Sequence, residues 1–233
     1  PFILRRKKAD VYKEIPPKIE QTLYCEMDDS QRKVYDAFLA EGRRKCEILK
    51  SGSHELSKFE ILSSLLRLRQ VCCHPDLIPG TLRPDADTPV RSAKMELLKE
   101  LLLESIDSGH KVLLFSQFTS LLSIVRNWLD SESIRYEYLD GATTDRMARV
   151  DSFNNSADIP LFLLSLKAGG LGLNLTSADT VIIYDPWWNP AAEAQAADRT
   201  HRIGQTKSVN CIKLLVKNSI EEKVLELQRM KAG

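Results

Sequence analysis

The sequence predicts an α/β protein in which helices sandwich a mostly parallel β-sheet, with an N-terminal helical protrusion before the sheet. Two observations support this prediction. From residue 91 onward, short apolar segments alternate with segments of helical periodicity, which is typical of strands that are each followed by a helix. Before residue 90, one alternating segment precedes two longer segments of helical spacing. With 233 residues, 43% of them hydrophobic, the chain can bury one such core and carry a helical appendage.

The bulk composition indicates the cellular compartment of the protein but leaves its function open. No stretch approaches the roughly 20 apolar residues that span a bilayer, so we expect no membrane partner. Five cysteines without framework spacing indicate a reducing compartment, and the charges of Arg5–Lys8 follow apolar residues, unlike those of a signal peptide. We expect an intracellular protein, in the cytoplasm or nucleoid if bacterial and in the nucleus if eukaryotic. A net charge of +1 neither indicates nor excludes nucleic acid.

The first 90 residues contain one predicted strand and two predicted helices. Residues 18–27 alternate between apolar and polar side chains, which predicts a half-buried strand with Ile19 on its apolar side. A helix is predicted to begin after Asp28, whose carboxylate suits an N-cap. A second helix is predicted over residues 56–72, and the prolines of residues 75–89 predict a loop. The apolar face predicted for the second helix consists of Ile61, Leu62, Leu65, Leu66, Leu68 and Val71.

Strands and helices alternate through the rest of the chain. Strands are predicted over residues 111–115, 136–139, 161–164, 181–184 and 210–216. Helices are predicted over residues 92–105, 120–129, 144–153, 190–200 and 220–230. In a parallel sheet, the loops beyond the carboxyl ends of the strands form the working surface. The segments with distinctive chemistry fall on those loops.

Two arginines stand three residues apart at the end of the helix predicted over residues 190–200. Because of this spacing, Arg199 and Arg202 project from nearly the same face. A guanidinium binds phosphate oxygens bidentately and stays charged at neutral pH. The pair therefore suits a triphosphate whose γ-phosphoryl group gains negative charge in the transition state, and Asp198 is placed to orient one arginine. The alternative is a surface salt-bridge cluster.

A glycine-rich segment, residues 165–175, directly follows a predicted strand. Gly170 and Gly172 allow backbone N–H groups to approach a phosphate or a nucleic-acid backbone closely. A dinucleotide-binding loop would need a third small residue where this sequence has Leu175, and no segment of the chain matches a P-loop. The alternative is a tight turn that serves packing only.

Polar and aromatic side chains follow three further predicted strands. Ser116 and Gln117 follow the first strand after residue 91, and residues 140–144 follow the second. Both segments suit contacts with a phosphate backbone. The alternative is that they are helix caps, because the same residue types also cap helices. Of the adjacent tryptophans 187 and 188, one can pack while the other faces a nucleic-acid strand, and for Trp187 we prefer a place in the core.

The run Cys72-Cys73-His74 does not predict a metal site. Adjacent cysteines suit one tetrahedral ion poorly, and no second pair of ligands with zinc spacing follows in the sequence. We therefore expect no metal ligands and interpret both cysteines as small residues that pack a helix.

Together and in this order, these segments resemble the second RecA-like lobe of the Swi/Snf-type ATPases of helicase superfamily two. Residues 69–75 resemble the end of the helical protrusion of that family. Residues 111–118, 165–175 and 195–205 resemble its motifs IV, V and VI. The resemblance covers nearly the whole chain and implies a RecA-like fold. Its implied divisions are an inter-lobe linker and strand (1–27), a helical protrusion and loop (28–90) and the second lobe (91–233).

The resemblance implies a DNA-dependent ATPase that translocates on double-stranded DNA and remodels protein–DNA complexes. ATP with Mg²⁺ is implied to be held mainly by a first RecA-like lobe, through Walker A and Walker B motifs that this sequence lacks. We therefore expect this chain alone to hydrolyse no ATP at a meaningful rate. The implied catalytic residues are the arginine fingers Arg199 and Arg202. Nucleotide contacts are implied for Gly170, Gly172, Gln195 and Asp198. DNA contacts are implied for Ser116, Gln117, Gly141, Thr143, Lys167, Trp188 and Asn189.

Three other functions stay open at this point. A stand-alone nucleic-acid-binding module would use the same loops without ATP, but it would leave the paired arginines without a role. A protein-interaction platform on the helices of residues 29–72 is compatible with the motor and supplies a further candidate partner. A nicotinamide-dependent oxidoreductase is disfavoured by Leu175.

Overall fold

The computed structural model describes residues 17–51, 58–82, 90–166, 173–198, 200, 205 and 207–232. Its strands are β1 (Lys18–Cys25), β2 (Val112–Ser116), β3 (Tyr136–Leu139), β4 (Leu161–Ser165), β5 (Thr180–Ile183) and β6 (Val209–Val216). Its α-helices are α2 (Asp29–Lys50), α3 (Lys58–Cys73), α4 (Ala93–Asp107), α5 (Thr119–Ser131), α6 (Arg146–Asn155), α7 (Pro190–Ala197) and α8 (Ile220–Ala232). Two short 3₁₀ helices, η1 (Pro75–Leu77) and η2 (Gly80–Leu82), lie in the segment predicted as a loop.

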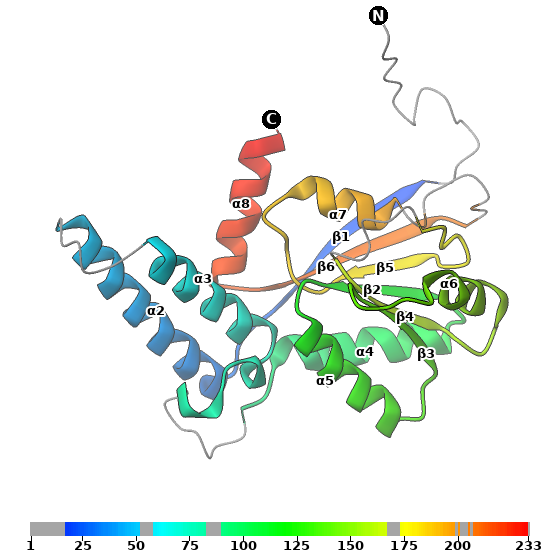
Figure 1. Ribbon diagram of the computed structural model, residues 1–233, viewed down its shortest axis with the longest axis horizontal. Coiled ribbons are helices and arrows are strands. Elements are labelled where there is room, and N and C mark those ends of the chain that lie inside the picture. The colour runs from blue at the N-terminus through cyan, green and yellow to red at the C-terminus, as the bar shows by residue number, and fades with distance from the viewer. Residues whose placement is uncertain are drawn as a thin grey trace, which may run out of the picture.

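All six strands form one parallel sheet in the order β1-β6-β5-β2-β4-β3. Figure 1 shows α4 and α5 on one face of the sheet and α6 and α7 on the other. The central strands β2, β4 and β5 are buried along their whole length, as expected for apolar strands covered on both faces. The predicted α/β fold with a mostly parallel sheet is therefore confirmed.

Two apolar clusters fill the spaces between the sheet and its helices. On one face, Val150 and Phe153 of α6 pack against Leu113 and Phe115 of β2. On the other face, residues of α4 and α5 pack against the alternate side chains of β2, including Leu114. Because successive side chains of a strand point to opposite faces, the same short run of apolar residues supplies both clusters.

Helices α2 and α3 form a pair that projects from one side of the sheet (Figure 1). The carboxylate of Asp28 caps α2 by accepting a hydrogen bond from the backbone N–H of Gln31 at 2.7 Å. The buried side-chain amide of Gln31 donates to the carbonyl of Val71 at 2.8 Å and accepts from the backbone N–H of Ala93 at 3.1 Å. The protrusion is therefore joined to α4 by directed hydrogen bonds as well as by apolar packing.

Two predictions about buried faces are wrong in part. Leu62 and Leu66 of α3 are 61% and 44% exposed, whereas Leu68 and Val71 are buried as predicted. The physical reason is that α3 is apolar around more of its circumference than α2 can cover, so spacing alone does not identify the covered side. Ile19 is 45% exposed because β1 is an edge strand, which has a neighbouring strand on one side only among the described residues.

A fully buried ion pair joins the two ends of the lobe. The ammonium of Lys94, in the first turn of α4, donates to the Glu221 carboxylate at 2.6 Å and to the carbonyl of Tyr184 at 3.2 Å. Burial alone would lower the pKa of Lys94, but the Glu221 carboxylate raises this pKa above its ordinary value, so the ammonium stays charged. Glu221 Oε2 also accepts from the backbone N–H of Val216 at 2.9 Å. Helices α4 and α8 and strand β6 thus meet at one buried charge pair.

The adjacent cysteines at the end of α3 are placed as the packing prediction requires. Cys72 and Cys73 are buried at the end of α3, where burial raises the pKa of both thiols, in agreement with a packing role. Within the described residues, no group of histidine, cysteine and carboxylate side chains has a metal-binding arrangement. No helix in the described part of the chain combines the length and apolarity that crossing a bilayer requires.

Candidate functional site

Several of the predicted site residues lie where the parallel strands end. In the sheet, Phe115 of β2 lies opposite Ile183 of β5, and Ser116 lies opposite Ser165 of β4. Since these strands are parallel, the segments that follow them emerge at the same edge. We call this edge, which carries residues 116–118, 140–145 and 184–189, the carboxyl edge.

Asp185 is the buried centre of the carboxyl edge. Its carboxylate accepts a hydrogen bond from the hydroxyl of Ser116 at 2.5 Å and weaker ones from the backbone N–H of Gln117 at 3.3 and 3.4 Å. The Ser116 hydroxyl in turn accepts from the backbone N–H of Phe118 at 3.1 Å. Burial raises the pKa of the Asp185 carboxyl, while the Ser116 hydroxyl opposes that shift. The loops after β2 and β5 are thus held together by one carboxylate.

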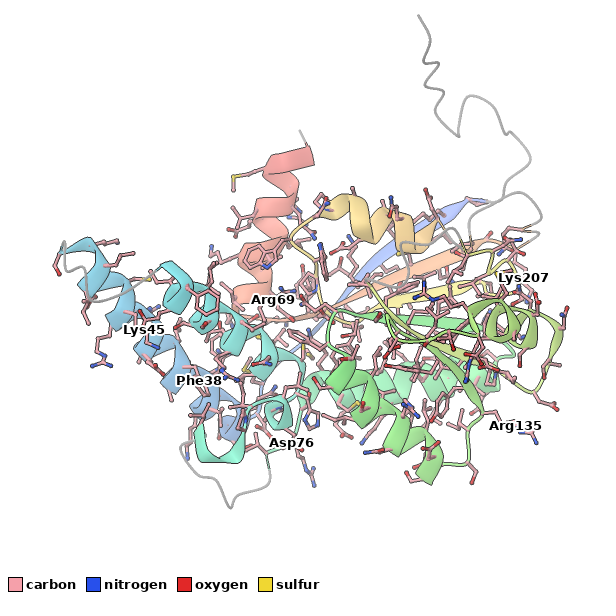
Figure 2. All side chains as sticks on the ribbon, viewed as in Figure 1. Phe38, Lys45, Arg69, Asp76, Arg135 and Lys207 are labelled. Carbon is pink, nitrogen blue, oxygen red and sulfur yellow. The ribbon has the colours of Figure 1, made fainter. Side chains whose placement is uncertain are left out.

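Arg69 of α3 reaches the carboxyl edge from the protrusion (Figure 2). It is 3% exposed. Its Nη1 donates to Gln117 Oε1 at 3.0 Å, and its Nη2 donates to the carbonyl of Pro186 and lies 3.8 Å from Asp185 Oδ2. The guanidinium carbon lies 5.4 Å from the ring centroid of Trp188, within the range of a cation–π contact. One side chain of the protrusion therefore contacts both loops.

The two tryptophans have different environments. Trp187 is half-buried and packs against the apolar cluster of the α6 face, whereas Trp188 is 36% exposed. The next residue, Asn189, accepts a hydrogen bond from the backbone N–H of Ala191 at 3.1 Å, and Pro190 occupies the first position of α7. The exposure of Trp188 leaves its indole accessible to a ligand, and the cap at Asn189 sets where α7 begins.

Glu193 anchors α7 to the rest of the lobe. Its side chain is 3% exposed and accepts from the backbone N–H of Trp187 at 2.7 Å and from the amide of Gln228 at 2.6 Å. Its second oxygen lies 2.8 Å from the ammonium of Lys213 on β6. The Gln228 amide also donates to the carbonyl of Trp187. The helix that precedes the two predicted arginine fingers is therefore fixed at its start to β6 and α8.

The loop after β3 is organised by Asp140. Its carboxylate accepts from the backbone N–H groups of Ala142 at 2.9 Å and Thr143 at 3.1 Å, and from the hydroxyl of Tyr138 at 2.8 Å. The Tyr138 hydroxyl and these loop N–H groups hold the pKa of Asp140 below its usual value. Gly141 sits at the exposed tip, where an added Cβ atom would meet open space. The tip is thus open to a ligand, while the Thr143 hydroxyl already bonds within the loop.

The predicted site residues that the structure describes fall into two groups, on the carboxyl edge and at α7. Gln117, Gly141, Thr143, Trp188 and Asn189 lie on the carboxyl edge and are at least partly exposed. Ser116 lies there too, but it is fully buried and bonded to Asp185, so its predicted DNA contact stays a prediction. Gln195 is exposed on α7, and Asp198 follows the end of α7. Outside the described residues lie Lys167, Gly170, Gly172, Arg199 and Arg202.

Sequence reasoning missed three residues that organise this site: Arg69, Asp185 and Glu193. Asp185 carried the clearest signal, because a carboxylate directly after a buried parallel strand stands at the working edge of the sheet. Arg69 entered only through the resemblance of residues 69–75 to the family protrusion. Nothing in the spacing of Glu193 indicates that it would be buried.

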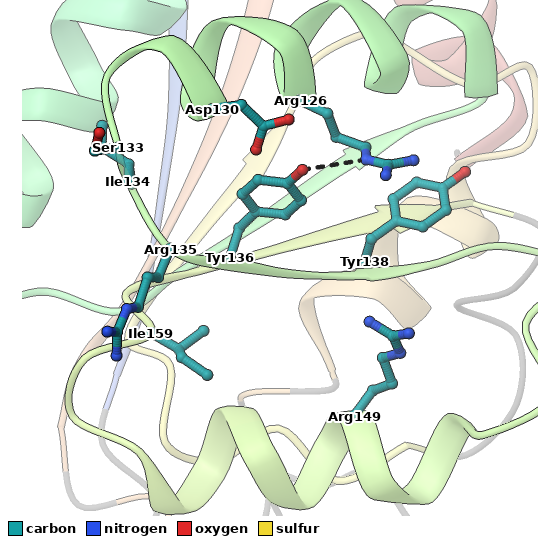
Figure 3. Close-up of a pocket in the computed structure, with 9 residues that line it drawn as sticks. All are labelled: Arg126, Asp130, Ser133, Ile134, Arg135, Tyr136, Tyr138, Arg149 and Ile159. Carbon is teal, nitrogen blue, oxygen red and sulfur yellow. Dashed lines mark hydrogen bonds between the residues drawn. The ribbon is translucent and has the colours of Figure 1, made fainter.

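A groove of about 610 Å³ runs along the outer side of β3, between α5 and α6 (Figure 3). Arg126 donates to the Tyr136 hydroxyl at 3.3 Å and stacks on Tyr138, while Arg149 pairs with Glu137 at 3.1 Å. None of the predicted site residues lines this groove. The groove therefore does not belong to the site at the carboxyl edge.

We expect Ser116→Ala to lower the free energy of unfolding by about 1–3 kcal/mol, because it leaves the buried Asp185 carboxylate without its hydroxyl donor. Urea unfolding followed by circular dichroism measures the change. Ser123→Ala is the matched control, since Ser123 is exposed on α5 and bonds only its own helix at 3.2 Å. Equal stability of the two variants would contradict the role given to Asp185.

Two family models match different parts of the chain. Residues 93–204 match the helicase conserved C-terminal domain, and residues 1–77 match the SNF2-related domain. The chain is 41% identical over 233 residues to the DNA excision repair protein CSB of Oryza sativa subsp. japonica, covering 98% of this chain and 19% of that protein. It is 39% identical to an uncharacterized ATP-dependent helicase of Mycoplasma pneumoniae, covering 99% of this chain and 22% of that protein. The chain thus spans only a minor part of these relatives.

Two solved structures have a similar fold. The crystal structure of the C-terminal part of the Fun30 ATPase domain superposes with a TM-score of 0.81 and 30% identity, covering 92% of this chain and 89% of that one. The Sulfolobus solfataricus SWI2/SNF2 ATPase core in complex with dsDNA superposes with a TM-score of 0.73 and 33% identity, covering 99% of this chain and 48% of that one.

Proposed function

Because the chain belongs to the Swi/Snf-type family of ATPases and has the fold of their C-terminal RecA-like lobe, we propose that it is the second motor lobe of a DNA-dependent translocase. In this proposal, ATP hydrolysis moves the protein along double-stranded DNA and remodels protein–DNA complexes. The first RecA-like lobe of the same protein holds most of ATP and Mg²⁺, and the lobe described above closes over the nucleotide.

The observation that carries the proposal is the joint position of the predicted DNA contacts on one edge of the sheet. Gln117, Gly141 and Trp188 follow three different strands, yet all three strands end at the carboxyl edge. Backbone and polar groups at such an edge suit phosphates and carry no sequence information, which fits a motor that moves along any sequence. The similarity to a Swi/Snf-type core bound to dsDNA supports the same assignment.

The proposed catalytic residues are the arginine fingers Arg199 and Arg202, which neutralise charge on the γ-phosphoryl group. The helix that precedes them in the sequence supports this role, since Glu193 fixes the start of α7 to β6 and α8. Preorganised cations stabilise a transition state more than mobile ones because no reorganisation is needed during the reaction. Gly170, Gly172, Gln195 and Asp198 are proposed to contact the nucleotide beside them.

The proposed DNA contacts combine exposed and buried groups. Gln117, Gly141, Thr143, Lys167, Trp188 and Asn189 are proposed to contact the duplex directly. Ser116 has a supporting part, because its hydroxyl is buried and bonded to Asp185, and its predicted contact with DNA stays a prediction.

A protein partner on the protrusion is a second proposal, compatible with the first. Phe59, Leu62 and Leu66 are 74%, 61% and 44% exposed along one side of α3. Exposed apolar side chains at this spacing are typical of a surface that contacts another protein. Binding to such a partner would add to the motor function without replacing it.

ATP hydrolysis by the full-length protein, measured with and without duplex DNA, tests the proposed function. We expect duplex DNA to stimulate turnover, because DNA contacts on this lobe favour its closure over the nucleotide. The chain alone is the matched control and is expected to show no turnover with or without DNA. Turnover that does not respond to DNA in the full-length protein would refute a DNA-dependent motor.

Replacing Lys167 by alanine is expected to weaken binding to duplexes of different sequence equally and to reduce the slope of log K against log salt by about 1. The reason is that one phosphate contact of a lysine releases about one counterion. Fluorescence anisotropy across a salt series measures the slope. Lys223→Ala is the control, since Lys223 is exposed on α8 and pairs with Glu226 at 2.9 Å. An unchanged slope for Lys167→Ala would show that Lys167 does not contact a phosphate of the duplex.

A further inference from the structure

Arg69 is a buried arginine whose contacts lie mainly outside its own helix. It belongs to α3 of the protrusion, but the residue is 3% exposed and its guanidinium reaches the carboxyl edge of the sheet. A buried guanidinium is costly unless hydrogen bonds and a counter-charge compensate for the lost water. The compensation comes from the loops after β2 and β5, through Gln117, Pro186 and Asp185.

The first of these contacts orients the side-chain amide of Gln117, which is a proposed DNA contact. Arg69 binds the carbonyl oxygen of the Gln117 amide at 3.0 Å, which determines where the NH₂ group of the same amide points. That NH₂ group is buried and has no acceptor among the described residues. Gln117 therefore holds a buried, unpaired donor at the carboxyl edge, and Arg69 fixes the amide to which this donor belongs.

The second contact concerns Trp188. The guanidinium of Arg69 lies 5.4 Å from the centroid of the indole, and the ring keeps 36% of its surface exposed. A cation on one side of the ring restricts its rotation while the rest of the ring remains accessible. Arg69 thus holds the two proposed DNA contacts, Gln117 and Trp188, relative to each other.

We propose that Arg69 is a positioning residue through which the helical protrusion sets Gln117 and Trp188 for duplex DNA. This inference rests on the proposed function and deepens it. It means that the protrusion, as well as the sheet with its loops, contributes to the DNA dependence of ATP hydrolysis. A guanidinium fits the role: its planar set of donors binds Gln117 and Pro186 while its central carbon lies 5.4 Å from the centroid of the Trp188 ring. A lysine ammonium cannot make these contacts together.

The test uses the full-length protein and the variants Arg69→Lys and Arg69→Met. The measured quantities are the duplex concentration that gives half-maximal ATPase stimulation and the turnover at saturating duplex. We expect the half-maximal concentration to rise about tenfold, which corresponds to about 1.4 kcal/mol, while turnover at saturation is largely kept. Arg67→Met is the matched control, since Arg67 lies on the same helix and bonds Gln70 at 3.2 Å.

A double-variant cycle separates positioning from a general loss of stability. If Arg69 acts through Gln117 and Trp188, adding Arg69→Met to the double variant Gln117→Ala/Trp188→Ala changes the half-maximal duplex concentration little beyond that double variant alone. Additive losses, or an unchanged half-maximal concentration in folded Arg69→Lys, would overturn the proposal. It is also overturned if both Arg69 variants unfold, because Arg69 would then be a stability element. Failure of the proposed function is distinct: wild-type turnover would then not respond to DNA.

Discussion

Replacing Arg199 or Arg202 by alanine in the full-length protein is expected to lower DNA-stimulated ATP turnover by about 10³- to 10⁵-fold, while affinity for duplex DNA is kept. The physical reason is that each guanidinium is proposed to neutralise charge that develops on the γ-phosphoryl group, whereas the DNA contacts lie on other loops. Steady-state hydrolysis at saturating duplex and fluorescence anisotropy of the same variants measure the two quantities separately.

Two comparisons make this prediction specific to the arginine fingers. Lysine at either position keeps a positive charge but loses bidentate geometry, so turnover is expected to stay low. Arg135→Ala is the control for loss of an arginine, because Arg135 is 71% exposed and its pair with Asp158 contributes little. Near-normal turnover in both alanine variants would leave the motor without its proposed chemistry and would favour a nucleic-acid-binding module.

Breaking the buried pair of Lys94 and Glu221 is expected to have the largest effect on stability. Lys94→Met or Glu221→Leu should lower the free energy of unfolding by about 3–5 kcal/mol, because each leaves an uncompensated charge in a site where both side chains are fully buried. The loss should be visible in urea unfolding, since α4, β6 and α8 all meet at this pair.

The double variant Lys94→Met/Glu221→Leu is the informative control for this pair. Apolar side chains of similar volume remove both charges together, so the double variant is expected to be more stable than Lys94→Met alone. The prediction is contradicted if the loss in free energy of unfolding of the double variant equals the sum of the losses of the two single variants. Each side chain would then stabilise the protein through contacts with other residues and not through the ion pair.

Much of the fold could be predicted because the strands are buried on both faces. Leu161–Ser165 is a short apolar run that is buried along its whole length, and its predicted limits differ from the structure by one residue. The edge strand Tyr136–Leu139, which lies between Arg135 and Asp140, was predicted with the limits that the structure has. The helix predicted over residues 190–200 ends in the structure at Ala197. Helix ends depend on local capping, which apolar periodicity does not report.

The sequence predicts which residues share the carboxyl edge, but it does not predict which contacts they make. That Gln117, Gly141 and Trp188 share an edge follows from a parallel sheet alone. The contact of Arg69 with Asp185 could not be predicted, because it joins the protrusion to a loop far along the chain and no local pattern encodes such a pair. The exposure of Leu62 was missed for a related reason: which side of an apolar helix is covered depends on its tertiary neighbours.

The central proposal is that ATP hydrolysis moves the full-length protein along duplex DNA, and we expect the two strands to stay paired as it moves. Displacement of a third-strand oligonucleotide from a duplex by the full-length protein tests it most directly. We predict release of the third strand with ATP, no release with a non-hydrolysable analogue, and an intact duplex afterwards. Hydrolysis that is stimulated by DNA but releases no third strand would contradict translocation.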